Sequence, residues 1–327
     1  MVTAGRGSYG AGMSLYPEIE PYDHGMLDVG DGNRVYWETC GNPRGKPALV
    51  LHGGPGSGCT PYFRRLFDPA AYRIVLLDQR GCGRSTPHAS AYGTDMSVNT
   101  TARLLADLES LRRRLGIGRW LVWGVSWGSV LGLRYAQTYP GVVSELVLTG
   151  VATGSEAEVE LLTRGLGKVF PEAFERFLAG LPEGAARDGN LAAAYNRLLE
   201  SPDPGVRARA WTDWETAIIP APPRSVQRFE DPEFRMGFAR TVTHYWGNGQ
   251  FLDGEGAVLR DAHLLKGVPG TLVQGSLDFG NLLGTVWQLQ HAWPDCELVV
   301  VSEAGHDAGA PGVREALVAA TDGYARR

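Results

Sequence analysis

The stretch that decides the fold is WGVSWGSVLG, residues 123–132, in which Ser126 lies two positions from a glycine on either side. An apolar run, WLVW (120–123), precedes it, and VLGL (130–133) follows it. This pattern is typical of a strand that turns sharply into a helix and holds a nucleophilic serine in a strained conformation. The pentapeptide alone also fits a tight turn with a structural serine. The rest of the chain decides between the two.

Short apolar segments recur along the chain, and continuous runs of this kind are typical of strands buried on both faces of a parallel sheet. They are ALVLH (48–52), RIVLLD (73–78), WLVWG (120–124), LVLTG (146–150), TLVQG (271–275) and ELVVV (297–301). Residues 26–41 predict a hairpin, and helical patterns cover 99–115, 127–138 and 312–325. The alternation predicts an α/β fold with a mostly parallel sheet flanked by helices.

Residues 151–262 interrupt this alternation. They lack strand signals and show amphipathic helical patterns at 157–179, 191–199 and 231–246, with a proline cluster at 218–225. Segments inserted after strands are well placed to cover an active site. The predicted division is a flexible leader (1–20), a core (21–150 and 263–327) and a helical cap (151–262).

A glycine-rich loop, LHGGPGSG (51–58), follows the strand predicted at 48–52. Consecutive glycines let backbone N–H groups approach a ligand closely. In an α/β-hydrolase this loop supplies one oxyanion donor and the residue after the nucleophile supplies the other. We therefore expect the oxyanion hole at Gly54 and Trp127.

A serine hydroxyl is a poor nucleophile until a base takes its proton. Of the seven histidines, His306 is best placed, because it lies in a loop directly after the strand predicted at 297–301. An acid must fix its tautomer, and Asp278 follows the strand predicted at 271–275, whereas Asp253 and Asp261 end no apparent strand. The order Ser126, Asp278, His306 is that of α/β-hydrolases.

Together these segments resemble the proline iminopeptidase family of α/β-hydrolases. The resemblance runs from about residue 20 to the C-terminal region. Its motifs are LHGGPGSG (51–58), LLDQRGCGRSTPH (76–88), RWLVWGVSWGSVLGLRYAQTYP (119–140), AWTDWE (210–215), HYW (244–246) and AGHDA (304–308). It implies a serine hydrolase on the α/β-hydrolase fold that releases N-terminal proline through an acyl-enzyme, without a cofactor.

The same resemblance implies that Glu215, which follows a W-x-x-W pattern, binds the charged amine of the substrate. We expect aromatic residues of the cap, including Trp214 and Tyr245, to shape the acyl pocket, with packing as the alternative role of these rings.

Four positions depart from the family pattern. Val242 stands where a second amine-binding glutamate is usual, Thr149 and Ser276 stand where arginines are usual, and Ala152 stands where a phenylalanine is usual. These changes predict a rewritten substrate pocket. The expected substrate is an N-terminal prolyl or aminoacyl peptide, or a related amide or ester that is larger or less cationic.

The composition of the chain argues against several classes of binding partner. Hydrophobic residues make up 43% and charged residues 20% of the chain, and the net charge of −5 argues against a nucleic-acid binder. No apolar run approaches the ~20 residues that span a bilayer. The N-terminus has no apolar signal-peptide core. The four cysteines match no metal-ligand spacing. We expect a cytoplasmic enzyme that acts on a small molecule or short peptide, with no metal, membrane or nucleic acid.

Two alternatives stay open at this point. An acyltransferase or cyclase, or a specialised amide or ester hydrolase of secondary metabolism, would use the same Ser126 acyl-enzyme. A non-catalytic small-molecule binding protein would use the same fold without the reaction. The residues alone determine neither the natural substrate nor the oligomeric state.

Overall fold

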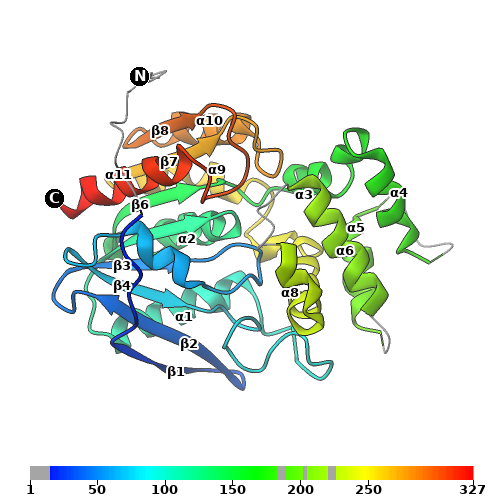
Figure 1. Cartoon of the computed structure of the whole chain (residues 1–327), viewed down its shortest axis with the longest axis horizontal. Coiled ribbons are helices and arrows are strands. Elements are labelled where there is room, and N and C mark those ends of the chain that lie inside the picture. Colours follow the sequence, from blue (N-terminus) through cyan, green and yellow to red (C-terminus); the bar gives the residue numbers. More distant parts are fainter. Residues whose placement is uncertain (1–14, 183–188, 202–204, 220–225, 327) are drawn as a thin grey trace.

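One mostly parallel sheet organises the chain in a computed structural model that describes residues 15–182, 189–201, 205–219 and 226–326 (Figure 1). Its eight strands lie in the order β1-β2-β4-β3-β5-β6-β7-β8. They are β1 (Asp23–Gly30), β2 (Asn33–Gly41), β3 (Lys46–Leu51), β4 (Tyr72–Leu77), β5 (Trp120–Val125), β6 (Val143–Thr149), β7 (Gly270–Gly275) and β8 (Cys296–Val301). The β1–β2 hairpin and the β2–β4 pair are antiparallel, and the remaining pairs are parallel. The predicted fold class is therefore confirmed.

Helices cover both faces of the sheet, which explains why its strands are apolar at successive positions. Along β3, Leu49 and Leu51 pack into one apolar cluster, whereas Ala48 and Val50 pack into the other. The first cluster includes side chains of α1 (Thr101–Arg114), α2 (Trp127–Thr138) and α10 (Leu283–Ala292), and the second includes those of α11 (Val313–Ala325). Since side chains of a strand alternate between faces, a strand covered on both sides carries no polar face.

A group of helices separates β6 from β7 and lies beyond one end of the sheet (Figure 1). They are α3 (Glu156–Thr163), α4 (Pro171–Ala179), α5 (Leu191–Leu199), α6 (Gly205–Ile218) and α8 (Pro232–Trp246). The short helix α9 (Ala257–Arg260) also precedes β7 but packs against α2 and α10 of the core. The predicted cap, residues 151–262, contains these helices, and we propose α3, α4, α5, α6 and α8 as the part of it that covers the cavity. The continuous helix predicted at 157–179 is divided into α3 and α4, because a 3-10 turn (Gly165–Lys168) follows α3 and Pro171 begins a new helix.

Two sequence predictions fall partly outside the described residues. Residues 1–14 of the predicted leader and residues 220–225 of the proline cluster lie outside the described residues. Within the described ranges, no helix has the length and apolar character needed to cross a membrane.

The turn between β5 and α2 depends on two glycines. A Cβ atom at Gly128 would overlap the carbonyl oxygen of Leu51, and one at Gly124 would overlap the carbonyl oxygen of Gly128. Both obstacles are backbone atoms, which no side-chain rotation can move. The first turn of α2 therefore packs directly against the end of β3, where the glycine-rich loop begins.

We predict that Gly128→Ala destabilises the protein by about 3 kcal/mol or more, the upper range for overpacking, because the obstacle is backbone. The matched control is Gly141→Ala, since a Cβ at Gly141 meets nothing within 4 Å. Urea unfolding followed by circular dichroism gives both values. Equal midpoints for the two variants would contradict the proposed close approach.

Candidate active site

Ser126 is the single residue between β5 and α2, and its backbone adopts a conformation that is rare for L-residues. Its φ is 55° and its ψ is −123°, and a positive φ at a non-glycine residue is uncommon and concentrated at functional sites. The turn is held because the Ser126 N–H donates to the carbonyl of Thr149 at 3.0 Å and the Ser129 hydroxyl donates to the Ser126 carbonyl at 2.6 Å. Hydrogen bonds to β6 and from α2 therefore hold the backbone of Ser126 in this strained conformation.

His306 and Asp278 meet in the loops after β8 and β7. The imidazole Nδ1 lies 2.9 Å from Oδ2 and 3.0 Å from Oδ1 of Asp278. The same carboxylate accepts hydrogen bonds from the Asn281 N–H at 2.9 Å and from the Gln274 side-chain amide at 3.0 Å. A carboxylate with this many donors keeps its orientation, so Nδ1 of His306 carries the proton and Nε2 is left as the basic nitrogen.

The two partners shift each other's pKa. Burial raises the pKa of Asp278, but the charge and hydrogen bond of His306, together with the hydrogen bonds from Asn281 and Gln274, bring that pKa below its usual value. Burial lowers the pKa of His306, but the charge and hydrogen bond of Asp278, together with the charges of Glu215 and Asp307, bring that pKa above its usual value. The raised pKa makes Nε2 of His306 a stronger base, and the ionised carboxylate stabilises the positive charge that forms when Nε2 takes a proton.

Sequence reasoning missed three residues that position this pair. Gln274 and Asn281 bind the Asp278 carboxylate, and Gly150 lies against the imidazole. A Cβ atom at Gly150 would lie 2.9 Å from Cε1 of His306. The one signal in the sequence is Gln274 itself, a polar residue inside the otherwise apolar run TLVQG.

The glycine-rich loop after β3 runs alongside the Ser126 turn. Gly54 and Gly56 adopt φ values of +109° and +103°, which favour glycine. Neither Gly54 N–H nor Trp127 N–H donates a backbone hydrogen bond to another described residue. Trp127 begins α2, so its amide also carries the positive end of the helix dipole. Both amides are free to bind an oxyanion.

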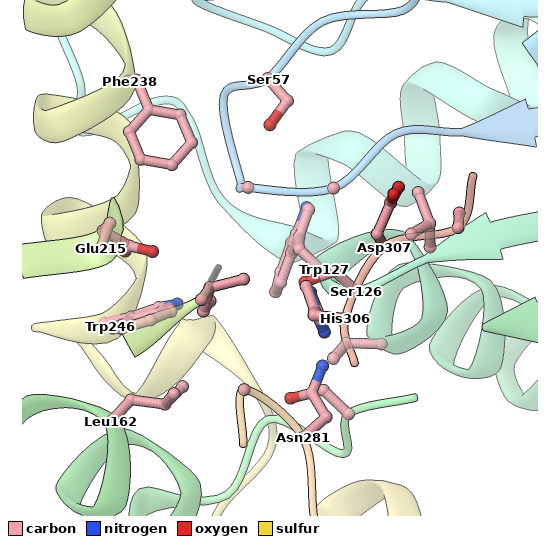
Figure 2. Close-up of a pocket in the computed structure, with 18 of the residues that line it drawn as sticks. Ser57, Ser126, Trp127, Leu162, Glu215, Phe238, Trp246, Asn281, His306 and Asp307 are labelled. Carbon is pink, nitrogen blue, oxygen red and sulfur yellow. The ribbon is translucent and has the colours of Figure 1, made fainter. Parts of the chain in front are cut away.

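A cavity of about 270 Å³ joins these groups to the cap. Ser126, His306, Gly54 and Trp127 line it from the core, and Glu215 lines it from α6. Figure 2 shows Glu215 and Trp246 on one side of the cavity, and Ser126, Trp127 and His306 on the other. Asp278 is buried behind His306. Within the described ranges, no three His, Cys, Asp or Glu side chains are grouped as metal ligands would be.

Glu215 is the unusual charged group of this cavity. Its side chain is buried, and its Oε1 has no hydrogen-bond partner among the described residues. Burial raises the pKa of Glu215 to about 7, against the opposing effects of the Trp211 indole and the charge of His306. A buried carboxylate oxygen without a partner costs stability. Such a cost is expected where a protein keeps a site ready for a positive ligand.

The structure places two predicted substrate contacts, Trp214 and Tyr245, away from the lining of the cavity. Trp214 and Tyr245 are both almost fully buried and neither lines the cavity. The Trp214 indole donates to the Leu162 carbonyl at 2.9 Å, and the Tyr245 hydroxyl donates to the Asn99 side chain at 2.8 Å. Both rings pack inside the protein, which was the alternative role. Of the aromatic residues expected in the cap, Trp246 does line the cavity.

The four departures from the family pattern do not all lie in the cavity. Ala152 lines it, whereas Val242, Thr149 and Ser276 do not. Val242 is fully buried in α8, Thr149 is buried in β6, and the Ser276 hydroxyl accepts a hydrogen bond from the Glu303 N–H. Of the four departures, only the one at Ala152 therefore changes the lining of the cavity, whereas the sequence predicts changes at all four positions.

Comparisons with known proteins agree with this geometry. A family model described as the alpha/beta hydrolase fold matches residues 46–311. A probable proline iminopeptidase of Streptomyces coelicolor is 80% identical over 320 residues, which cover 96% of this chain and 98% of that protein. The proline iminopeptidase of Xylella fastidiosa is 45% identical over 317 residues, which cover 95% of this chain and 99% of that protein.

Solved structures show the same fold at much lower identity. The crystal structure of proline iminopeptidase from Mycobacterium smegmatis has a TM-score of 0.60 and 19% identity, covering 93% of this chain and 98% of that one. The proline iminopeptidase-related protein from Thermus thermophilus gives the same TM-score and identity, covering 93% of this chain and 97% of that one.

We predict that Glu215→Gln makes folding less sensitive to pH. The folded wild type binds a proton at Glu215 with a pKa of about 7, against 4.5 for the ordinary value. Stability from this group is therefore present below pH 4.5 and lost as the pH rises to 7. The loss amounts to about 3 kcal/mol. The free energy of unfolding of each protein, measured from pH 4 to pH 8, tests this.

The control is Glu175→Gln, which removes an exposed carboxylate from α4. Its difference from wild type is expected to stay constant across the same pH range. A constant difference for Glu215→Gln as well would show that Glu215 has an ordinary environment.

Proposed function

Since the chain belongs to the proline iminopeptidase family of α/β-hydrolases, we propose that Ser126, His306 and Asp278 are the catalytic triad with which it releases proline from the N-terminus of short peptides. That it is a serine hydrolase of the aminopeptidase type follows from its relatives. The assignment of residues and of the prolyl substrate is our proposal. It rests mainly on Glu215, which lies across the cavity from His306 and whose buried Oε1 has no partner in the described part of the chain.

The reaction proceeds through an acyl-enzyme. The Ser126 oxygen attacks the prolyl carbonyl carbon while Nε2 of His306 takes the hydroxyl proton. The tetrahedral oxyanion accepts hydrogen bonds from the N–H groups of Gly54 and Trp127. His306 then returns the proton to the leaving nitrogen as the C–N bond breaks. Water repeats the sequence on the prolyl ester and releases free proline.

Asp278 acts on His306 rather than on substrate. Its two oxygens hold the imidazole by Nδ1 and stabilise the positive charge that forms when Nε2 takes the proton. Gln274 and Asn281 keep that carboxylate ionised and oriented.

Glu215 selects substrates with a free amine. A protonated prolyl nitrogen placed beside it would give the buried carboxylate the partner that it lacks, and ion pairs strengthen where water is excluded. Chains without a positive N-terminus would leave the carboxylate unpaired. This accounts for removal of one residue from an N-terminus instead of cleavage inside a chain.

The net charge and the free cysteines support the predicted cytoplasmic location and the prediction that the protein does not bind nucleic acid. The four cysteines are free thiols, and disulfides are rare in the cytosol. The net charge of −5 gives no basis for binding nucleic acid. We therefore propose a cytoplasmic enzyme that acts on short peptides. The relatives reported above give no support to an acyltransferase, a cyclase or a non-catalytic binding protein.

We predict that Ser126→Ala lowers kcat on a prolyl arylamide by about 10⁶-fold and that Asp278→Asn lowers it by about 10⁴-fold, as in other serine triads. The control is Ser110→Ala, an exposed hydroxyl on α1, with kcat unchanged. Active Ser126→Ala protein, purified free of host peptidases, would refute the assignment.

We predict that Glu215→Gln lowers kcat/KM about 10- to 100-fold on substrates with a free N-terminal amine, the loss expected for one charge-assisted hydrogen bond. Matched substrates are a prolyl arylamide and its N-acetylated form. Wild type should strongly prefer the free amine, and the variant should lose that preference. A wild type that prefers the blocked amine would instead support the less cationic substrate predicted from Val242.

A further inference from the structure

A second unpaired charge lies in the same cavity. Arg228, in the short 3-10 turn (Arg228–Glu230) before α8, lines the cavity beside Phe229 and Phe238. No ion pair or hydrogen bond joins its guanidinium to another residue in the described ranges, and its Nε is buried without a partner. The mechanism above does not use this group.

Arg228 is half-buried, whereas the fully buried arginines of the described ranges are paired. Arg80 binds Asp107 at 2.6 Å, Arg64 binds Glu38 at 2.7 Å, and Arg240 binds Glu200 at 2.7 Å. Removing a cation from water without a counter-ion is costly. Arg228 therefore differs from the arginines that hold the fold together.

An aromatic ring holds the guanidinium in place without using its donors. The Arg228 Cζ lies 4.3 Å from the centroid of the Phe234 ring, and that ring packs in turn against Phe238. Stacking fixes the plane of a guanidinium and leaves its N–H edge available. That edge matches a carboxylate, which can accept two parallel hydrogen bonds from it.

The carboxylates of the cavity do not neutralise Arg228. Glu158 accepts hydrogen bonds from the N–H groups at the start of α3, and Asp307 accepts one from the Gly309 N–H. Glu215 forms no ion pair with Arg228, and the charge that acts on its pKa is that of His306. Among the described residues no carboxylate pairs with Arg228, so a ligand with a carboxylate fits this position.

Arg228 lies near the glycine-rich loop. Burial lowers the pKa of His52, and the charge of Arg228 adds to that effect. His52 immediately precedes the loop, and its Nδ1 lies 2.9 Å from the Gly53 carbonyl. The cavity thus has an anion near the base and a cation near the oxyanion loop, with Ser126 also lining it.

We propose that Arg228 binds the C-terminal carboxylate of the leaving residue, so that prolyl dipeptides with a free C-terminus are preferred substrates. This inference rests on the proposed function, because it assumes that Glu215 holds the prolyl amine. A zwitterionic dipeptide then satisfies both unpaired charges of the cavity at once. It also presents its scissile bond to Ser126.

The test compares prolyl-alanine with prolyl-alaninamide, which differ only in the C-terminal charge. The measured quantity is the ratio of their kcat/KM values in wild type divided by the same ratio in Arg228→Gln. This double ratio cancels both the leaving-group chemistry and the amount of active enzyme. We expect it to be about 10 to 100, the loss of one charge-assisted interaction.

Two further variants sharpen the result. Arg228→Lys keeps the charge but not the planar fork, and its double ratio should lie between 1 and that of Arg228→Gln. The control Arg176→Gln changes an exposed arginine on α4 that pairs with Glu172, and its double ratio should be 1.

The outcomes separate this inference from the proposed function. Wild type that cleaves both dipeptides with a double ratio near 1 for Arg228→Gln and Arg228→Lys would overturn the role of Arg228 and leave the aminopeptidase assignment intact. Wild type that cleaves neither dipeptide nor the prolyl arylamide would overturn both.

Discussion

The structure depends on one close approach, that of the first turn of α2 to the carbonyl end of β3. It is available only because residues 124 and 128 lack a Cβ atom. This contact forces Ser126 into its positive φ and brings it beside the glycine-rich loop, which leaves the same strand. Two strand ends in register thus supply what we propose are the nucleophile and the oxyanion donors. The energy of packing the sheet sustains the strain at the serine.

Charge is handled differently in the scaffold and in the cavity. In the scaffold, Arg80 is bound by Asp107 and by the carbonyl oxygens of Val29 and Val98. In the cavity, Glu215 and Arg228 each keep a buried atom without a partner. An unpaired buried charge is a cost to folding that a ligand of opposite charge removes. In our proposal the same two residues therefore connect the stability of the free protein with its selectivity for substrate.

The sequence predicted the sheet well because burial on both faces gives strands a distinctive apolar run, and each predicted run contains a strand. Ser126, Asp278 and His306 could be proposed from the sequence for the same reason, since each lies in the turn or loop that follows such a run. The cap was harder to predict. Helix α6 was not among the expected helices, and the inward faces of α6 and α8 depend on which helices they pack against. For this reason the sequence did not reveal that the Trp214 and Tyr245 rings pack inside the protein. No sequence motif indicated Arg228.

The central claim is that Ser126 is made reactive by His306 and Asp278. A fluorophosphonate, which reacts with activated serines, tests it most directly when the labelled protein is digested and the adduct is located by mass spectrometry. We expect one adduct, on Ser126. It should form quickly in wild type and at least a thousandfold more slowly in His306→Ala, because that variant lacks the base that activates the serine. An unlabelled Ser126, or labelling at the same rate in both proteins, would contradict it.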